Sequence, residues 1–285
     1  MKPAGRLRAL LAEPGIIVMP SCFDALSARL IERSGFSATF MSGFAVSAAR
    51  VGLPDTGLMS YAEVVDQGRN ICSAVSIPVI GDGDTGYGNP LNVQRTVRGF
   101  ADAGFACIML EDQVAPKRCG HTHGKQIVGR NEAFARIQAA IDARDAGADI
   151  LIMARTDANA TDGLEEAIFR CRTFAEMGVD ITFLEAPRNE DEMRVYCEGL
   201  PGPKMANMVE QGDSPFLPPE RLAAIGYKIV IYPLTLMLAS VRAMENALSA
   251  IKAGRHPEEL AAFPYLREIV GFPEYYDAET KYVSD

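Results

Sequence analysis

Short apolar runs recur along the whole chain, and a stretch with helical periodicity follows most of them. The runs are continuous rather than alternating, as is typical of parallel strands that are buried on both faces. This alternation predicts an α/β fold in which eight strand–helix units close into a (β/α)8 barrel of the TIM type. The predicted strands cover residues 15–19, 38–41, 77–81, 105–110, 149–154, 180–184, 204–208 and 227–232.

The segments between these runs carry apolar residues at helical spacing, and several end in glycine, which favours a helix C-terminus. Ser60 and Asn131 have side chains that cap helix N-termini, so we expect a helix to begin directly after each. The clearest predicted helices lie within residues 23–35, 91–104, 131–147 and 164–178.

A doubly wound open sheet is the alternative α/β architecture, and it usually carries a glycine-rich phosphate-binding turn after its first strand. Residues 20–28 (PSCFDALSA) contain no such turn, so the barrel is favoured. We expect residues 1–285 to form a single barrel domain. Residues 255–285 are richer in aromatic and charged residues, and we predict that they form a helical extension, an arm that packs on a neighbouring subunit.

The chain is acidic, with a net charge of −9 and a pI near 5.0. It has no basic stripe, which argues against nucleic acid as a partner. Arg8, Glu13 and Pro14 interrupt the N-terminal stretch, so we expect no signal peptide, and no window has the length of a membrane span. The six cysteines form no CxxC pair, which favours a cytoplasmic location and argues against a structural zinc site.

Polar residues follow nearly every predicted strand, at the face where TIM-type barrels gather their chemistry. A turn or a helix cap explains any one of them, but not a set in which acids follow strands three and four and an arginine follows strand five. Buried carboxylates are costly unless a cation shares them. The set comprises Ser42, Gly43, Asp82, Asp84, Glu111, Asp112, Arg155, Thr156, Asp157, Glu185, Asn207, Pro233 and Thr235.

Asp82, Asp84 and Glu111 supply the hard oxygen ligands that magnesium prefers. Because Mg2+ usually keeps several waters, Asp55 can join the site through one of them, and substrate oxygens can take the place of others. Mn2+ fits the same ligands. We therefore predict a Mg2+ site, with Mn2+ as the alternative ion, that polarises a substrate oxygen and stabilises an enolate.

Arg155 and the Ser42-Gly43 turn add groups that bind carboxylates. An arginine can hold a carboxylate by two parallel hydrogen bonds, and such a turn offers backbone N–H groups and a hydroxyl. The predicted substrate is therefore a small dicarboxylate.

Residues 111–125 (EDQVAPKRCGHTHGK) place a thiol among cations, beside the predicted metal ligands. Lys117, Arg118 and His121 would lower the pKa of Cys119 by opposing the charge of its thiolate. A thiol above an enolate can deliver a proton to carbon, which makes Cys119 a candidate general acid. A single cysteine is more often a small buried apolar residue, but three neighbouring cations favour the catalytic interpretation.

Gly120 and Gly124 would let this loop fold down over the site and exclude water. The alternative is that His121 and His123 form a metal pair. A zinc site needs a third nitrogen or sulfur ligand, and none is evident, so the metal pair is disfavoured.

The run KRCGH at residues 117–121, with DGDTGYGN at 82–89 and EDQ at 111–113, resembles the isocitrate lyase/phosphoenolpyruvate mutase superfamily. KRCGH is the specific motif, whereas the acidic motif is shared more widely. The resemblance covers nearly the whole chain and continues through residues 42–48 (SGFAVSA), 152–158 (IMARTDA), 182–188 (TFLEAPR) and 232–240 (YPLTLMLAS).

The resemblance implies a magnesium-dependent (β/α)8 barrel, usually a homotetramer whose subunits exchange a C-terminal helix. It implies that Asp82 binds the metal directly and that Asp55, Asp84 and Glu111 hold its waters.

The resemblance also implies that Cys119 is the acid, so Cys119, Arg118 and His121 are the candidate catalytic residues. The residues that it places around the substrate are Ser42, Gly43, Phe44, Arg155, Glu185 and Asn207.

KRCGH marks the carbon–carbon lyase branch of the superfamily, but the chain departs from its best-known members at three points. Phe40 stands where isocitrate and methylisocitrate lyases carry tyrosine, and residues 183–186 (FLEA) lack the proline of methylisocitrate lyases. Residues 214–215 are Ser-Pro where Thr-Pro is usual. Phe40 and residues 182–188 are more similar to the group of 2,3-dimethylmalate lyase, oxaloacetate hydrolase and petal death protein.

The implied reaction is a retro-aldol (Claisen-type) cleavage of a malate-like 2-hydroxy diacid to a 2-oxo acid and an enolate, which Cys119 protonates. With Phe40 in place of tyrosine, the base is a magnesium-held water or a nearby carboxylate. Three alternatives stay open at this point. They are oxaloacetate hydrolysis or phosphonate mutase chemistry on the same fold, a barrel that binds a small acid without turnover, and a structural protein.

Overall fold

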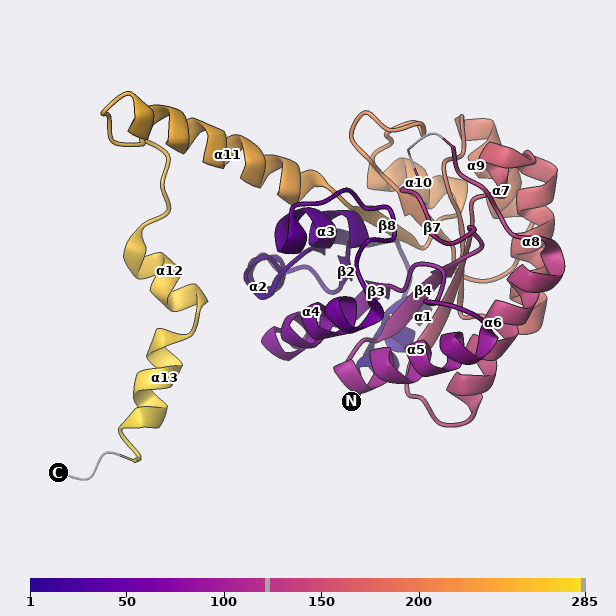
Figure 1. The fold of residues 1–285 in the computed structure, drawn as a ribbon, viewed down its shortest axis with the longest axis horizontal. Helices are drawn as coiled ribbons and strands as arrows, with labels where there is room; N and C mark the ends of the chain where they lie inside the picture. Colours follow the sequence, from indigo (N-terminus) through magenta and orange to yellow (C-terminus); the bar gives the residue numbers. More distant parts are fainter. Residues whose placement is uncertain (121–123, 283–285) are drawn as a thin grey trace. The chain divides into compact units, whose positions relative to one another are not determined.

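The computed structural model describes residues 1–120 and 124–282, and Figure 1 shows its helices and strands. Eight parallel strands form one sheet in the order β6-β5-β4-β3-β2-β1-β8-β7. Its two edges meet where Thr182 of β6 bridges Lys204, directly before β7, so the sheet closes into a barrel. The strands are β1 (Ile17–Cys22), β2 (Thr39–Met41), β3 (Val79–Asp82), β4 (Cys107–Glu111), β5 (Leu151–Thr156), β6 (Ile181–Leu184), β7 (Met205–Asn207) and β8 (Ile229–Tyr232).

The predicted (β/α)8 barrel is confirmed, and each predicted strand overlaps an observed one. Several strands begin later than their apolar runs, as in β4, which begins at Cys107 rather than at residue 105. There Gly104 ends the preceding helix in the left-handed conformation, and the N–H of Phe105 still bonds back to the carbonyl of Phe100. Phe105, the first residue of this run, therefore belongs to the turn.

Helices connect the strands and surround the barrel (Figure 1). The first half of the chain contributes α1 (Pro3–Ala12), α2 (Ala25–Arg33), α3 (Gly43–Val51), α4 (Tyr61–Ala74), α5 (Pro90–Ala103) and α6 (Arg130–Asp145). The second half contributes α7 (Ala158–Thr161), α8 (Leu164–Met177), α9 (Glu190–Glu198) and α10 (Pro219–Ile225). Three more helices follow the last strand along the chain, namely α11 (Thr235–Lys252), α12 (Phe263–Ile269) and α13 (Phe272–Glu279).

The two predicted helix caps have different outcomes. Ser60 is the N-cap of α4, where its hydroxyl accepts from the N–H of Glu63 in a capping box. The prediction for Asn131 is wrong, because α6 begins at Arg130, two residues earlier than expected, with Gly129 as its N-cap. The N–H of Val128 bonds to the carbonyl of Asp112, so the extended segment ends there and the chain turns into the helix ahead of Asn131.

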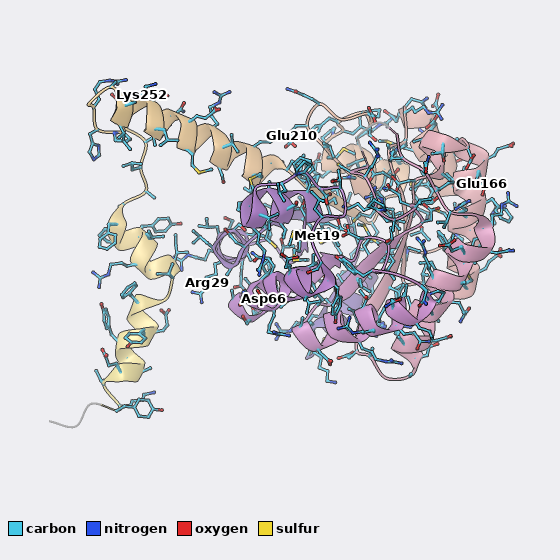
Figure 2. The ribbon with its side chains drawn as sticks, in the orientation of Figure 1. Met19, Arg29, Asp66, Glu166, Glu210 and Lys252 are labelled. Carbon is cyan, nitrogen blue, oxygen red and sulfur yellow. The ribbon has the colours of Figure 1, made fainter. Side chains whose placement is uncertain are left out.

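The barrel interior is filled by apolar side chains from alternate strand positions. Met19, labelled in Figure 2, is fully buried in a cluster that includes Ile80, Met153 and Met205. Leu7 of α1 joins this cluster with no exposed surface, so α1 is anchored to the barrel core. Burial of one such side chain stabilises the fold by roughly 1.5–3 kcal/mol.

The chain divides into two compact units, Met1–Thr235 and Leu236–Asp285. The first contains the barrel. The described part of the second contains α11 after Thr235, α12 and α13, and its buried hydrophobic residues there are Ala250 and Ile269. The C-terminal extension was predicted to begin at residue 255, whereas this division falls at the beginning of α11. Of the helices in the two described ranges, none combines the length and apolar content of a membrane span.

Candidate active site

A cavity of about 250 Å³ lies at the carboxyl ends of the strands, where the sequence predicts the chemistry. This volume suits a small molecule rather than a polymer. Its lining residues are Phe40, Ser42, Phe44, Asp55, Asp82, Met109, Glu111, Lys117, Arg118, Cys119, Gly120, Arg155, Phe183, Glu185, Asn207, Val209, Gln211, Gly212, Ile231, Pro233 and Leu234. The structure therefore brings together most of the predicted site residues from seven strand ends or their loops.

The predicted metal ligands form an acidic cluster around Lys117. Its Nζ lies 2.6 Å from Oδ2 of Asp55 and 2.8 Å from Oδ1 of Asp84. The backbone N–H of Asp84 donates to Oδ1 of Asp82 at 3.0 Å. Burial raises the pKa of Asp82 to about 6, and the charges of Asp84 and Asp55 add to that effect while Lys117 opposes it. The carboxylates therefore carry more negative charge than the one lysine offsets.

Lys117 forms ion pairs with two carboxylates of the acidic cluster, and its effect on the pKa of Cys119 stays a prediction. Burial lowers the pKa of its amine, but the charges of Asp84, Asp82 and Asp55 outweigh that effect and raise the pKa well above its usual value. Its ammonium group is directed at the carboxylates of Asp55 and Asp84, because opposite charges at ion-pair distance dominate its placement.

Arg155 of β5 forms ion pairs with a second group of carboxylates. Its Nη1 is 3.0 Å from Oε2 of Glu185, and its Nε is 3.3 Å from Oε2 of Glu111. Asp157 accepts two parallel hydrogen bonds, from Nε at 2.8 Å and from Nη2 at 3.0 Å. Arg155 is thus held in one orientation by carboxylates on three sides, in the paired geometry that guanidinium groups favour.

Glu111 connects the two charged groups and has an oxygen with spare bonding capacity. Its Oε1 is buried and has no hydrogen-bond partner among the described residues. Burial raises the pKa of this carboxyl well above its usual value, although Arg155 acts in the opposite direction. A buried carboxylate oxygen without a partner is costly, and a cation or a water held by a cation would satisfy it.

The donor set fits a divalent cation. Asp82 and Glu111 end neighbouring strands, Asp84 follows β3, and Asp55 comes from the loop after α3. These four carboxylates supply the hard oxygen ligands that Mg2+ and Mn2+ take. As the side chains stand, no three acidic, histidine or cysteine residues in the described ranges are grouped to hold an ion. The ammonium of Lys117 bridges two of the four carboxylates. The assignment of individual ligands stays a prediction.

Gly43 allows Asp82 to lie close to the first turn of α3. A Cβ atom at position 43 would come within 2.6 Å of Oδ2 of Asp82, which is closer than real Cβ contacts. Ser42 is the N-cap of α3, and its buried hydroxyl accepts from the N–H of Ala45. The positive end of the helix dipole therefore faces the acidic cluster and the cavity.

The other predicted substrate residues also lie at this cavity. Nδ2 of Asn207 is 3.3 Å from both carboxylate oxygens of Glu185, so these two side chains orient each other. Phe44 is partly exposed at the cavity rim, with 37% of its surface accessible. Phe40 is buried and presents a ring where the resemblance leads one to expect a tyrosine.

Cys119 is half-buried and lines the cavity beside the arginine. A Cβ atom on the next residue, Gly120, would lie 2.5 Å from Nη2 of Arg155 and 2.8 Å from the side chain of Glu185. Only a glycine permits this approach, so the Cys119–Gly120 segment lies directly against the Arg155–Glu185 pair. Arg118 also lines the cavity, whereas His121 lies outside the described residues.

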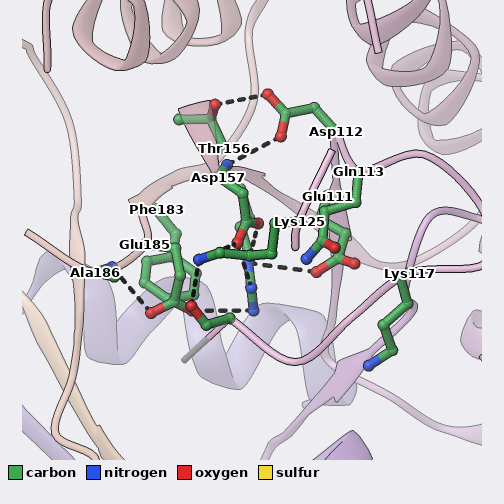
Figure 3. Close-up of polar contacts among 12 residues, drawn as sticks. Glu111, Asp112, Gln113, Lys117, Lys125, Thr156, Asp157, Phe183, Glu185 and Ala186 are labelled. Atoms are coloured by element: carbon green, nitrogen blue, oxygen red, sulfur yellow. Dashed lines mark hydrogen bonds and ion pairs between the residues drawn. The ribbon is translucent and has the colours of Figure 1, made fainter. Parts of the chain in front are cut away.

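Two acidic residues of the strand-end set, Asp112 and Asp157, support the site without lining the cavity. Asp157 orients Arg155, and Asp112 in turn fixes the backbone around Asp157 (Figure 3). Oδ2 of Asp112 accepts from the hydroxyl of Thr156 at 2.6 Å, and its Oδ1 accepts from the N–H of Asp157 at 2.9 Å. Successive residues of a strand point to opposite faces. Because Glu111 faces the cavity, this alternation predicts that the side chain of Asp112 points away from it.

The family model described as phosphoenolpyruvate phosphomutase matches residues 7–252. The chain belongs to the phosphoenolpyruvate mutase/isocitrate lyase superfamily. Among curated relatives, it is 40% identical to the 2,3-dimethylmalate lyase of Eubacterium barkeri, over 100% of this chain and 99% of the relative.

Solved structures of this superfamily share the fold over the whole chain. An oxaloacetate acetylhydrolase in complex with the inhibitor 3,3-difluorooxalacetate has a TM-score of 0.95 at 33% identity, covering 98% of this chain and 97% of the other. A phosphonopyruvate hydrolase in complex with oxalate and Mg2+ has a TM-score of 0.87 at 29% identity, covering 100% of both chains.

Proposed function

We propose that the chain is a magnesium-dependent carbon–carbon lyase that cleaves a small 2-hydroxy dicarboxylate to a 2-oxo acid and a carboxylic acid. The observation that carries this proposal is the set of side chains that line one small cavity. An acidic cluster, a buried arginine and Cys119 all line it, so a cation site, a carboxylate-binding group and a proton donor face the same volume.

The similar proteins support this class of reaction. The 2,3-dimethylmalate lyase among them supports a carbon–carbon lyase. The phosphonopyruvate hydrolase forms a complex with oxalate, a small dicarboxylate, and with Mg2+. The donor set of Asp55, Asp82, Asp84 and Glu111 suits the same ion, with Mn2+ as the alternative.

In the proposed reaction the acidic cluster holds the ion. We assign Asp82 as its direct ligand and Asp55, Asp84 and Glu111 as partners of its waters. When bound, a divalent ion polarises a substrate oxygen and offsets the negative charge that burial makes unfavourable here.

The chain's own residues then handle binding and protons. Arg155 and the N-terminus of α3 at Ser42 attract the substrate carboxylates. Phe40 offers no hydroxyl, so a cavity carboxylate takes the proton of the 2-hydroxyl group. The C2–C3 bond breaks, its electron pair stays with C3 as an enolate, and the S–H of Cys119 delivers its proton to that carbon. Solvent reprotonates the thiolate after the products leave.

The apolar side of the cavity narrows the substrate class. Phe40, Met109, Phe183 and Ile231 line it, and each is almost fully buried. Alkyl groups on C2 or C3 can lie against these side chains, whereas a third carboxylate would be desolvated there without a cation. We therefore expect an alkyl-substituted malate to be preferred over a tricarboxylate, with each methyl group contributing about 1–3 kcal/mol to the preference.

Hydrolysis of oxaloacetate is the second candidate, because the oxaloacetate acetylhydrolase structure has the TM-score of 0.95 over nearly the whole chain. A substrate panel separates the candidates. Malate, alkyl-substituted malates, oxaloacetate and phosphonopyruvate are incubated with the protein, with and without EDTA, and released 2-oxo acids and carboxylic acids are measured. We expect EDTA-sensitive cleavage of alkyl malates. Turnover of phosphonopyruvate alone would exclude the lyase proposal.

We also propose that the chain assembles as a homotetramer through its C-terminal helices. Leu238, Val241, Met244, Leu248 and Ile251 recur at helical spacing along α11, and each is at least 43% exposed. A long apolar stripe of this kind needs a partner surface. Sedimentation of a monomer at micromolar concentration would contradict this assembly.

We propose a cytoplasmic location as well, since Cys22, Cys72, Cys107, Cys171 and Cys197 are free thiols.

A further inference from the structure

The residue before Cys119 is held by a single buried side chain. Nε2 of Gln113 donates to the carbonyl of Arg118 at 2.8 Å, and Oε1 of Gln113 accepts from the N–H of Arg118 at 2.9 Å. One amide thus satisfies both backbone groups of one residue, as a neighbouring β-strand would. Gln113 is only 1% exposed, so bulk water does not compete for these two bonds.

Gln113 is itself fixed to the barrel. The N–H of Val114 bonds to the carbonyl of Gln126 at 2.8 Å, and the N–H of Val128 bonds to the carbonyl of Asp112 at 2.9 Å. Nη1 of Arg136, on α6, donates to the carbonyl of Gln113 at 2.8 Å. The backbone that carries the Gln113 side chain is therefore fixed by a short antiparallel pairing with residues 126–128 and by the buried Arg136.

The residue after Cys119 is held by a second side chain. Nζ of Lys125 donates to the carbonyl of Gly120 and lies 3.4 Å from Oδ1 of Asp157. Asp157 is the carboxylate that accepts two hydrogen bonds from Arg155, so Lys125 joins the cysteine segment to the group that orients the arginine (Figure 3). The side chain of Lys125 is 5% exposed.

We propose that Gln113 and Lys125 are positioning residues that fix Cys119 at the cavity from both sides. Neither side chain is among the described residues that line the cavity, so neither needs to touch the substrate. The proposal rests on the proposed function in taking Cys119 as the proton donor. Proton transfer to carbon requires close placement, and a displacement of about 1 Å can lower a rate about 100-fold.

The test compares Gln113→Met and Lys125→Met with two matched controls. Gln138→Met changes an exposed amide that donates to Asp142 on α6, and Lys2→Met changes an exposed ammonium near Asp149. Lys125→Arg tests rescue, because a guanidinium can still bridge a carbonyl and a carboxylate. Each protein is assayed for kcat and KM on the cleaved diacid. The rate at which iodoacetamide labels Cys119 is also measured by peptide mass spectrometry, with and without oxalate.

We expect kcat to fall about 100-fold in both methionine variants while KM changes less than about threefold, since Arg155 and the acidic cluster remain. Labelling of Cys119 should become faster and less sensitive to oxalate, the arginine variant should recover most of kcat, and the controls should match the parent protein. A purely structural role would lower kcat and raise KM together.

Two results would overturn the proposal. One is labelling and kcat equal to those of the controls, and the other is a loss of kcat that KM follows in parallel. If the parent protein cleaves none of the diacids, the proposed function fails, and the labelling rates alone then decide whether the two side chains fix Cys119.

Discussion

The two ends of the barrel bury side chains of opposite kind. Around α1 and the beginnings of the strands, Leu7, Ile17 and Leu151 lie in a core without charge. At the strand ends, Glu111 and Glu185 are just as inaccessible to solvent, at 4% and 1% exposure. Apolar burial stabilises the first region, whereas desolvation of charge raises the pKa of Glu111 in the second. Burial therefore stabilises the fold at the apolar end and destabilises it at the charged end, so the apolar core offsets the free energy that the site costs.

The largest expected effect is a loss of turnover, without a loss of stability, when Cys119 at the charged end of the barrel is replaced. Cys119→Ser should lower kcat by about 10²–10⁴-fold, the usual range for loss of a general acid, because the serine hydroxyl is a much weaker acid. Oxalate affinity and the midpoint of urea unfolding should stay unchanged. Cys72→Ser, on α4, makes the same chemical change away from the cavity and should leave kcat unaltered. Full activity of the Cys119 variant would remove the proton-donor role.

The converse change at the apolar end should affect stability alone. Leu7→Ala removes a fully buried side chain from the core and should lower the free energy of unfolding by about 2–5 kcal/mol. Urea titration measures this, and kcat of the folded fraction should not change. Leu91→Ala, at a position that is 74% exposed, is the control and should change stability by less than about 0.5 kcal/mol. A Leu7 variant with normal stability but reduced kcat would break the comparison.

The cost of the charged end should also depend on pH. The pKa of Asp82 is raised from 3.8 to about 6, so the folded state binds a proton more tightly than the unfolded chain between these values. In protein that a chelator has freed of metal, the contribution of Asp82 to the free energy of unfolding should therefore fall as pH rises from about 4 to about 6. Urea titrations of the parent protein and Asp82→Asn at several pH values measure it.

Added Mg2+ should restore that stability in the parent protein, because the bound ion offsets the negative charge that a proton offsets at lower pH. It should have less effect on the Asp82→Asn variant, which lacks this charge. A parent protein that gains stability relative to the variant as pH rises in the absence of metal would contradict the expected sign.

A partly solvated ion-pair network gives the smallest expected effect. Glu166 contacts Arg130 and Arg170, and their hydrogen bonds lower the pKa of its carboxyl although partial burial acts the other way. A lowered pKa means stability that is present above the unfolded value of 4.5 and is lost as pH falls through the folded one. Glu166→Gln should cost about 1 kcal/mol or less at neutral pH and nothing in acid. A thermal melt at both pH values tests this.

The fold was accessible from sequence because parallel strands buried on both faces give continuous apolar runs, and eight of them leave few architectures. Helix starts were less certain, as Asn131 illustrates. A good capping side chain does not decide a boundary when a backbone pairing, here between Val128 and Asp112, already ends the extended segment.

The candidate site was predicted wherever a residue type identifies its own chemistry. Asp82, Glu111, Arg155 and Cys119 all line the cavity. The roles that depend on direction were not accessible, because a sequence does not show which neighbour a long side chain reaches. The ion pairs of Lys117 are an example, because they join it to Asp55 in a loop and to Asp84 in the turn after β3, and the sequence did not show either contact.

Gly43 shows how much of the site depends on an absent atom. Nothing about this residue is acidic, basic or reactive, yet the room beside Asp82 exists because no side chain starts there. A methyl group at this position would come within 2.6 Å of Oδ2 of Asp82, so one of the two would have to move. We expect Gly43→Ala to keep the barrel and lose activity, and such a variant would serve as a reference that separates the protein's presence from its chemistry in living cells.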